Sequence, residues 1–405
     1  MDTHSILVVY HTYYYRLGTR ARSLPGKLPD AHGCMLNIAP EDMIHADTRA
    51  LLQSPVPVSS RASPAGERTV KGLDSIRFWC ALWVYFSHFG FIARPRGWGW
   101  PIAAVGIYNN LFCGVGAVIA FFVISGFCIH YPFVGTQKLP LGAFYVRRYV
   151  RIVCPLAVAL LLGALLGERL VSFYENIIWS LIAELIYYTI YPVLRIAFLR
   201  WKWDFILAAY AGAFALIALN PSAGDFHQFG PELTWVVGLP SWLLGCGLAT
   251  WASEDRSSRR TAPWLWRGSV WAASSSASVL RFHAGIGYPL TLTIFGVLVF
   301  FWIREEIRYY RFAPAPIFLE FCGRWSYSIY LVHGLAVIGL ALLRYETGFP
   351  LRGAPYWALQ TIFVLMLSFC FYLAVEMPSH RLARYLARVV RKREELPAGS
   401  LSRGL

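Results

Sequence analysis

Charged residues are scarce in this sequence. Asp, Glu, Lys and Arg make up 15% of its 405 residues, whereas hydrophobic residues make up 57% and aromatic residues 16%. Soluble domains carry about 25% charged residues, so the composition excludes that class and indicates an integral membrane protein. The net charge is +15. In so apolar a chain, this charge is typical of Lys and Arg residues gathered in cytoplasmic loops beside anionic lipid headgroups. We therefore predict no nucleic-acid partner.

Closely spaced cysteines are also absent. Metal and redox sites need cysteines a few residues apart, and none are spaced in this way, so we interpret the cysteines as small core residues and predict no metal. The sequence also has no internal repeat and no Gly-rich phosphate loop. The eight cysteines are Cys34, Cys80, Cys113, Cys128, Cys154, Cys246, Cys322 and Cys370.

Long apolar runs are abundant instead. A helix that crosses a bilayer needs about 20 mostly apolar residues, and ten segments meet that requirement. The predicted fold is therefore all-α, a polytopic integral membrane bundle of about ten transmembrane helices. The predicted spans are residues 74–93, 113–133, 149–167, 174–194, 203–219, 233–251, 264–282, 287–303, 317–343 and 355–378.

The basic residues predict the orientation of these spans. If the N-terminus is cytoplasmic, each inner segment carries at least three Lys or Arg residues and no outer segment carries more than two, as the positive-inside rule requires. Both termini are then cytoplasmic. We predict an aperiodic, poorly ordered N-terminal tail over residues 1–70, a transmembrane domain over 71–380 and a basic C-terminal tail over 381–405, which begins as a helix on the inner membrane face.

The first span carries two ionisable residues, Arg77 and His88. They are eleven residues apart, which is about 20° from three full turns, so both side chains share one helix face about 16 Å apart. With Arg77 at the inner headgroups, His88 lies near the membrane midplane, where ionisable residues are functional candidates. The alternative is a neutral histidine bonded to a neighbouring helix and a snorkelling arginine. Asp74 can cap this helix and pair with Arg77.

Further polar residues recur at helical spacing in three later spans. A buried carboxylate needs a partner, and several inward polar stripes in one bundle favour a shared wet cavity, although tyrosine stripes often serve packing. These residues are Ser180, Glu184, Tyr187 and Tyr191 in the fourth span, Ser326, Tyr330 and His333 in the ninth, and Glu376 at the end of the tenth.

Three arginines cluster where the third span begins, in the stretch FYVRRYVRIVCP. A single basic residue at this level ordinarily serves as a topology signal. Arg147, Arg148 and Arg151 lie within five residues of one another, however, and at the same inner level as Arg77. Such a group is suited to clamping a phosphorylated ligand.

These segments together resemble the membrane-bound acyltransferase 3 family, which moves acyl groups onto carbohydrates and related acceptors. The resemblance rests on GLDSIRFWCALWVYFSH, FFVISGF, RRYVRIVCP, WSLIAE, GRWSYSIYLVH and VEMPSHR, in this order across residues 72–381. It implies an acyl-CoA donor, usually acetyl-CoA, that enters from the cytoplasm, and an acceptor hydroxyl reached from the other side. It also implies that His88 is the essential histidine and Arg77 its partner.

We therefore predict an O-acyltransferase of the bacterial cytoplasmic membrane that transfers an acyl group, acetyl in the first instance, to a carbohydrate or glycoconjugate. His88 acts either as general base or as an acyl-carrying nucleophile. The alternative is a secondary transporter or flippase for a sugar or glycolipid, although the inverted repeats typical of transporters are not found. The predicted residues are His88, Arg77 and Glu184 for catalysis, Arg147, Arg148, Arg151, Ser326 and Tyr327 for the donor, and Tyr187, Tyr330, His333 and Glu376 for the acceptor.

Overall fold

The computed structural model describes most of the predicted transmembrane domain. The described residues are 70–90, 102–136, 139–167, 174–257, 262–348, 350–351 and 353–395. The chain divides into two units, 1–64 and 65–405, and every described residue belongs to the second. The predicted N-terminal tail lies outside the described residues except for Val70, and so does the predicted C-terminal tail beyond Glu395.

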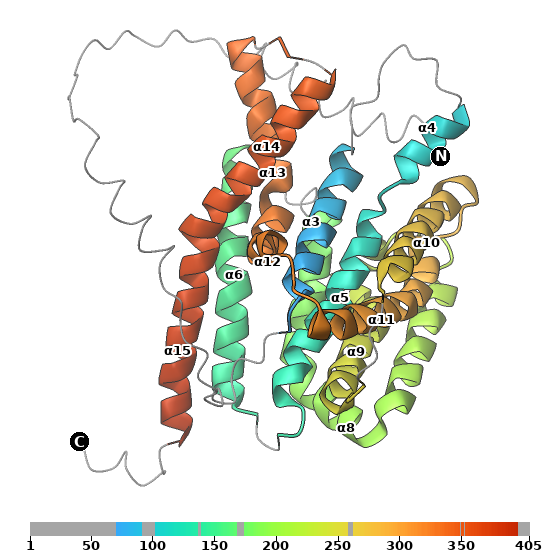
Figure 1. The fold of residues 1–405 in the computed structure, drawn as a ribbon, viewed down its shortest axis with the longest axis vertical. Coiled ribbons are helices and arrows are strands. Elements are labelled where there is room, and N and C mark those ends of the chain that lie inside the picture. Colours follow the sequence, from blue (N-terminus) through green and yellow to red (C-terminus); the bar gives the residue numbers. More distant parts are fainter. Residues whose placement is uncertain are drawn as a thin grey trace, which may run out of the picture. The chain divides into compact units, whose positions relative to one another are not determined.

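The described residues form helices and no strand, which confirms the all-α prediction (Figure 1). Short 3-10 helices occupy Tyr131–Phe133 and Phe226–Phe229, and π-helical segments occupy Tyr174–Ile178 and Tyr372–Glu376. The α-helices are α3 (Leu73–Phe89), α4 (Ile102–Asn110), α5 (Gly114–His130), α6 (Leu141–Leu165), α8 (Trp179–Leu219), α9 (Gly230–Glu254), α10 (Trp264–His283), α11 (Tyr288–Phe312), α12 (Ile317–Gly323), α13 (Ser326–Thr347), α14 (Gly353–Phe371) and α15 (Met377–Glu395).

Six helical segments of the described chain are long and apolar enough to cross a membrane. Helices α3, α10 and α11, which were also expected to span, are not among them. The count of ten spans and the cytoplasmic position of both termini therefore remain predictions. The six segments are Gly106–Phe133, Leu141–Leu165, Trp179–Leu219, Phe226–Glu254, Ser326–Thr347 and Gly353–Glu394.

Four predicted spans are joined, divided or extended in the structure. Helix α8 covers the fourth and fifth spans and kinks at Lys202, whose φ of 39° and ψ of −107° are not helical. The ninth span is divided between α12 and α13. Beside the break, Gly323 packs so closely on α3 that a Cβ there would lie 1.9 Å from the Asp74 carbonyl oxygen. The tenth span continues through the π-helical segment Tyr372–Glu376 into α15.

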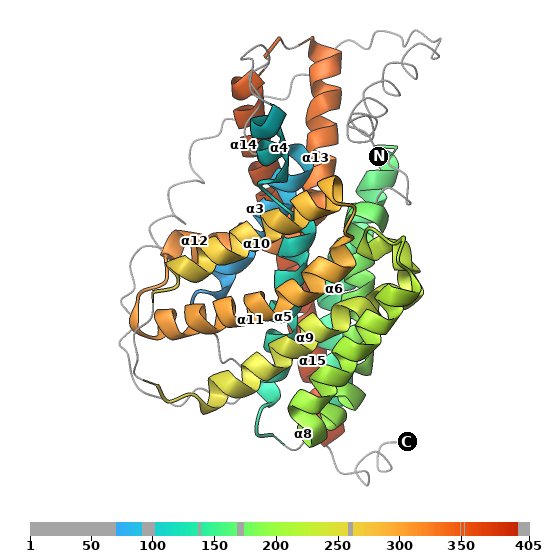
Figure 2. The ribbon, with the colours of Figure 1, turned by 90° about the vertical axis from the view of Figure 1, so that its right-hand side faces the viewer.

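Helix α5 lies at the centre of the bundle and packs against α3, α9 and α11. Its closest neighbour is α9, because glycines face each other across the contact. A Cβ on Gly126 would lie 1.9 Å from the Trp242 carbonyl oxygen, and one on Gly245 would lie 2.1 Å from that of Val123. Small residues of this kind let two helix backbones approach closely inside a membrane. Helices α10, α11, α9 and α8 follow one another across one side (Figure 2).

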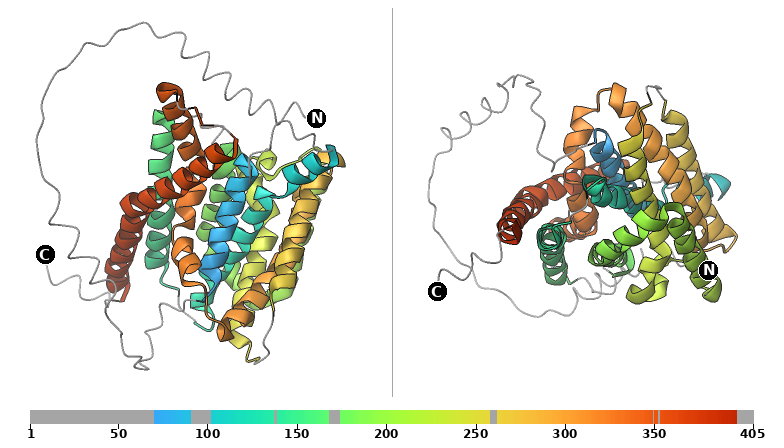
Figure 3. Two further views of the ribbon diagram at one scale, coloured as in Figure 1. Left: turned by 45° about the horizontal axis from the view of Figure 1, so that its top comes forward. Right: turned by 90° about the horizontal axis from the view of Figure 1, so that it is seen from below.

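Helix α15 runs antiparallel to α6, beside which it lies in Figures 1 and 3. The Gly142 amide at the start of α6 donates to Glu394 Oε1 near the end of α15 at 2.7 Å. Ala383 and Ala387 form part of the buried side of α15. The helix predicted in the C-terminal tail is therefore present and continues from α14, and it is packed along its length on a neighbouring helix.

Candidate active site

Two histidines meet at one end of α3. His88 lies in the last turn of α3, and its Nδ1 is 2.9 Å from His333 Nε2 on α13. The other ring nitrogen of His333, Nδ1, lies 3.0 Å and 2.9 Å from the carbonyl oxygens of Ile329 and Tyr330. Carbonyls only accept hydrogen bonds, so Nδ1 of His333 carries its proton and Nε2 is an acceptor. The hydrogen-bond network therefore assigns the proton of His88 to Nδ1 and leaves a lone pair on its Nε2.

The two histidines differ in their exposure. His333 is buried, with 1% of its surface accessible, and the rings of Tyr85 and Phe89 contact it edge-on. His88 is half-buried, and its ring stacks on that of His333 with centroids 5.2 Å apart. His333 is therefore enclosed on several sides, and His88 is the less buried member of the pair.

Tyr330 lies one turn before His333 and connects α13 to α8. Its hydroxyl is 2.7 Å from Ser180 Oγ, and Ser180 also donates to the carbonyl oxygen of Ile177 in the π-helical segment Tyr174–Ile178. The predicted polar stripes of the fourth and ninth spans thus meet at this contact.

Arg77 and Arg148 converge on a single residue of α5. Arg77 Nη2 lies 3.1 Å from Cys128 Sγ, and Arg148 Nη2 lies 3.3 Å from the Cys128 carbonyl oxygen. Arg77 Nη1 is also paired with Asp74 Oδ1 at 2.9 Å, which confirms the predicted ion pair. The predicted cap was wrong, because Gly72 occupies the N-cap position of α3 and no side chain bonds there.

Glu184 on α8 is half-buried, and its carboxylate accepts two hydrogen bonds. Ser125 Oγ donates to Glu184 Oε1 at 2.7 Å, and the Tyr188 hydroxyl donates to the same oxygen. The guanidinium of Arg148 lies over the Tyr188 ring, 5.8 Å from its centre. Ser125 belongs to the FFVISGF stretch, so this network joins three of the segments that sequence analysis singled out.

Glu376 is buried at the junction of α13 and the π-helical segment Tyr372–Glu376. Its Oε2 accepts hydrogen bonds from the Ser328 amide at 3.1 Å and from Ser328 Oγ, and only 1% of its surface is exposed. The charges of Arg77 and Arg151 act on this carboxylate. A π-helical turn is often found at functional sites, and here Glu376 is the last residue of such a turn.

His380 and Arg384 on α15 join the same group of charges, although sequence analysis did not single them out. His380 Nε2 lies 3.6 Å from Glu376 Oε1, and the charges of Arg151, Arg384, Arg147 and Arg77 all act on His380. Within the described chain, neither Arg151 nor Arg384 forms an ion pair with a carboxylate. The missed signal is the spacing of four residues from Glu376 to His380 and on to Arg384, which places all three on one helix face.

The remaining predicted residues have mainly packing contacts. Tyr187 is fully buried, packs on Phe122, and donates its hydroxyl to the Trp235 carbonyl oxygen at 2.7 Å. Tyr327 ties α13 to α6 by donating to the carbonyl oxygen of Ile152 at 3.0 Å. Ser326 is buried in the first turn of α13. In the part of the chain that the structure describes, no group of His, Cys, Asp and Glu side chains is arranged to hold a metal ion.

Comparison with protein families decides what class of protein carries this arrangement. A family model described as an acyltransferase domain, that of the acyltransferase 3 family, matches residues 70–375. The chain belongs to this family. The match covers the histidine pair, Arg77 and all three arginines of α6, and stops one residue before Glu376. No curated protein and no solved structure matches the chain. Together with its apolar helices, the family identifies an integral membrane acyltransferase.

Proposed function

We propose that this acyltransferase moves an acyl group, acetyl in the first instance, from cytoplasmic acyl-CoA to a hydroxyl of a carbohydrate or glycoconjugate. We place it in the bacterial cytoplasmic membrane with ten spans and both termini inside. The observation that carries the proposal is the bond between His88 and His333, since it leaves Nε2 of His88 unprotonated. A neutral imidazole with a free lone pair is the state that a general base needs.

In the proposed reaction, His88 Nε2 takes the proton of the acceptor hydroxyl while its oxygen attacks the thioester carbonyl carbon. The new C–O bond forms, the C–S bond breaks, and the proton passes from His88 to the sulfur of the departing CoA. While His88 is protonated, its Nδ1–H donates to the neutral Nε2 of His333, and hydrogen bonds from charged donors are the stronger ones. His333 is therefore a positioning residue that stabilises the imidazolium.

The arginines at the other end of α3 are proposed to hold the phosphates of the donor. Arg77, Arg148 and Arg151 come from α3 and α6, and Arg384 adds a cation from α15. Guanidinium groups are well matched to phosphate oxygens. Arg77 and His88 are separated by eleven residues of one continuous helix, or about 16 Å, which suits phosphates at one end and the thioester of a long pantetheine arm at the other.

Glu184 is proposed to orient the acceptor. Both hydrogen bonds to its carboxylate go to Oε1, so Oε2 can accept one from an acceptor hydroxyl. Glu376 is assigned a positioning role instead, because its buried carboxylate is already bound by Ser328 and lies beside the donor-site arginines.

The proposal is tested by His88→Gln in the full-length protein, purified from membranes and supplied with labelled acetyl-CoA and candidate glycan acceptors. Loss of a general base lowers the rate by about 100-fold to 10,000-fold. The control is His283→Gln, which changes an exposed histidine at the end of α10. Full transfer by a correctly inserted His88→Gln variant would refute the role of His88. Label retained on the denatured enzyme would favour an acyl-histidine over direct transfer.

A further inference from the structure

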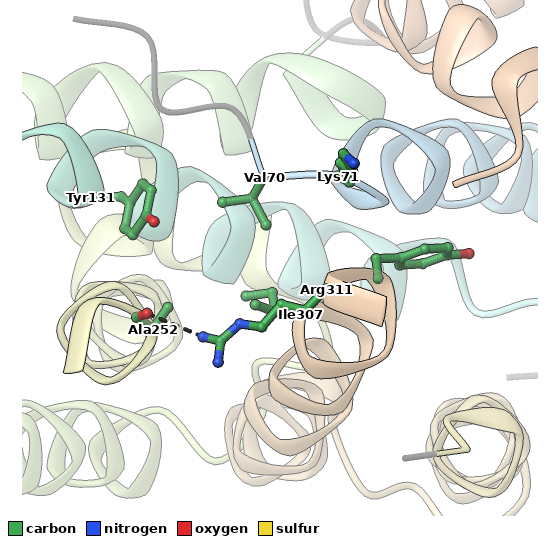
Figure 4. A pocket seen from close by; sticks show the side chains of 7 residues that line it. Val70, Lys71, Tyr131, Ala252, Ile307 and Arg311 are labelled. Carbon is green, nitrogen blue, oxygen red and sulfur yellow. Dashed lines mark hydrogen bonds between the residues drawn. The ribbon is translucent and has the colours of Figure 1, made fainter. Parts of the chain in front are cut away.

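A pocket outside the proposed active site lies where several helices end. Its volume is about 250 Å³, and it is formed by the residues before α3 and by the ends of α5, α9 and α11. Figure 4 shows the Arg311 side chain reaching from α11 toward Ala252 on α9, with Val70 beside it and Tyr131 on another wall. In the proposed topology all of these helix ends lie at the inner surface of the membrane.

Lys71 and Arg311 give this pocket a positive rim. Lys71 is exposed, and it forms no ion pair with a carboxylate of the described residues. Arg311 reaches Asp255 Oδ2 at 2.8 Å, and Arg308 approaches the same carboxylate at 3.5 Å. Arg308 also pairs with Glu305 Oε1 at 3.0 Å, and Arg304 reaches the same oxygen at 2.8 Å. Three arginines thus share the two carboxylates of Asp255 and Glu305, which together with Lys71 leaves cationic charge near the pocket that these carboxylates do not balance.

Asp255 keeps its charge in this setting. It lies in the loop after α9, where burial raises its pKa, but the hydrogen bonds from Ser257 and Arg308 and the charges of Arg308 and Arg311 outweigh that effect. The net pKa of Asp255 is therefore below its usual value. The cationic excess near the pocket therefore persists even though the Asp255 carboxylate is ionised.

The size and chemistry of the pocket fit a small anionic group. Its volume of about 250 Å³ is below the range of about 300–1,000 Å³ that encloses a drug-sized ligand, so a phosphate and its ester fit better than a whole nucleotide. Tyr131 contributes a hydroxyl to which no described residue bonds. Basic pockets between helices at the cytoplasmic surface bind phosphorylated lipid headgroups.

We propose that this pocket binds a phosphate ester at the inner membrane surface, with Lys71 and Arg311 as its cations and Tyr131 as a hydrogen-bond donor. Two sources carry this chemistry, the headgroup of an anionic phospholipid and the 3′-phosphate of CoA. The second source is within reach because Tyr131 lies one turn after Cys128, the residue contacted by Arg77 and Arg148.

The lipid source is tested by titrating the detergent-purified full-length protein with short-chain phosphatidylglycerol or phosphatidylcholine and measuring its melting temperature. Only phosphatidylglycerol should raise it. Lys71→Gln and Tyr131→Phe should each weaken the apparent affinity roughly tenfold, the effect of losing one hydrogen bond to a charged group. The control is Lys392→Gln, which removes an exposed lysine of α15 outside the pocket and should behave as the unaltered protein does.

The CoA source is tested by comparing the binding of CoA and 3′-dephospho-CoA by calorimetry. If the pocket takes the 3′-phosphate, the unaltered protein binds CoA more tightly and Lys71→Gln abolishes the difference. If binding weakens in the Lys71 or Tyr131 variants in one of the two experiments, the proposed pocket is supported and that experiment identifies its ligand. If neither substitution weakens binding in either experiment, the proposal is overturned. The lipid experiment requires no acyl transfer, so its result does not depend on whether the proposed acyltransferase reaction is correct.

Discussion

The sharpest test of the histidine pair is the removal of His333. His333→Phe keeps a buried aromatic ring but removes the acceptor for His88 Nδ1, which lies 2.9 Å away. A hydrogen bond from a charged donor contributes about 1.5–3 kcal/mol, and each 1.36 kcal/mol changes a rate tenfold. We therefore expect kcat to fall roughly 10-fold to 150-fold, with the KM for acyl-CoA unchanged because His333 does not contact the donor-site arginines.

The assay is release of labelled CoA thiol by the purified protein under steady-state conditions, normalised to correctly folded enzyme. His333→Gln supplies an amide oxygen that can accept from His88, so it should recover part of the lost kcat. The control is His130→Gln, which alters another buried histidine, bonded to Tyr191 on α8, and should leave kcat per folded molecule unchanged. Unchanged kcat in His333→Phe, or an effect on KM alone, would refute the assignment of His333 as a positioning residue.

Two further predictions concern the donor site and the packing of the bundle. Arg384→Ala should raise the KM for acyl-CoA roughly tenfold with little change in kcat. Arg381→Ala, whose guanidinium bonds to Met377 and forms no ion pair with a carboxylate of the described residues, should leave both KM and kcat unchanged. Equal KM values in the two variants would remove Arg384 from the donor site. Gly126→Ala should destabilise the protein by at least about 1–3 kcal/mol, because its Cβ would meet the Trp242 carbonyl oxygen at 1.9 Å. Gly339→Ala, where no atom of the described residues lies within 4 Å of the new Cβ, should not lower the melting temperature. Similar losses of stability in both variants would contradict the close packing of α5 on α9.

The residues of each polar stripe were predictable from the sequence, because side chains that share a helix face follow from helical spacing alone. The alignment of Arg77 with His88 needs only that α3 is a continuous helix over Leu73–Phe89, as it is. The pairing of His88 with His333 was not predictable, since it joins residues 245 positions apart. Hydropathy does not show which helices are neighbours, so the sequence could not place His333 beside His88. His333 was therefore predicted to bind the acceptor.

The breaks within the apolar runs differed in how well they could be predicted. The kink at Lys202 follows a local fall in hydropathy, in the stretch RWKWD, and a break was expected there. The break between α12 and α13 falls in the stretch GRWSYS, which also carries a charged residue and two serines, but the ninth span was predicted to run through it. The break lies where Gly323 packs against the backbone of Asp74, a tertiary contact. The π-helical segment that carries Glu376 lies just before Pro378, and a proline disturbs the preceding helical turn because it lacks an N–H. That signal does not distinguish a π-helical turn from the end of a helix.

The histidine pair also bears on the choice between acyl transfer and transport. A transporter would line a membrane cavity with polar side chains too, and the polar stripes alone fit both functions. Binding a neutral sugar requires hydrogen bonds of suitable direction but no particular basicity. Here His333 Nδ1 is held by two carbonyl oxygens, which fixes the tautomer of His88 and keeps its Nε2 basic. A fixed tautomer matters for moving a proton, so the geometry favours the chemistry that the family match indicates.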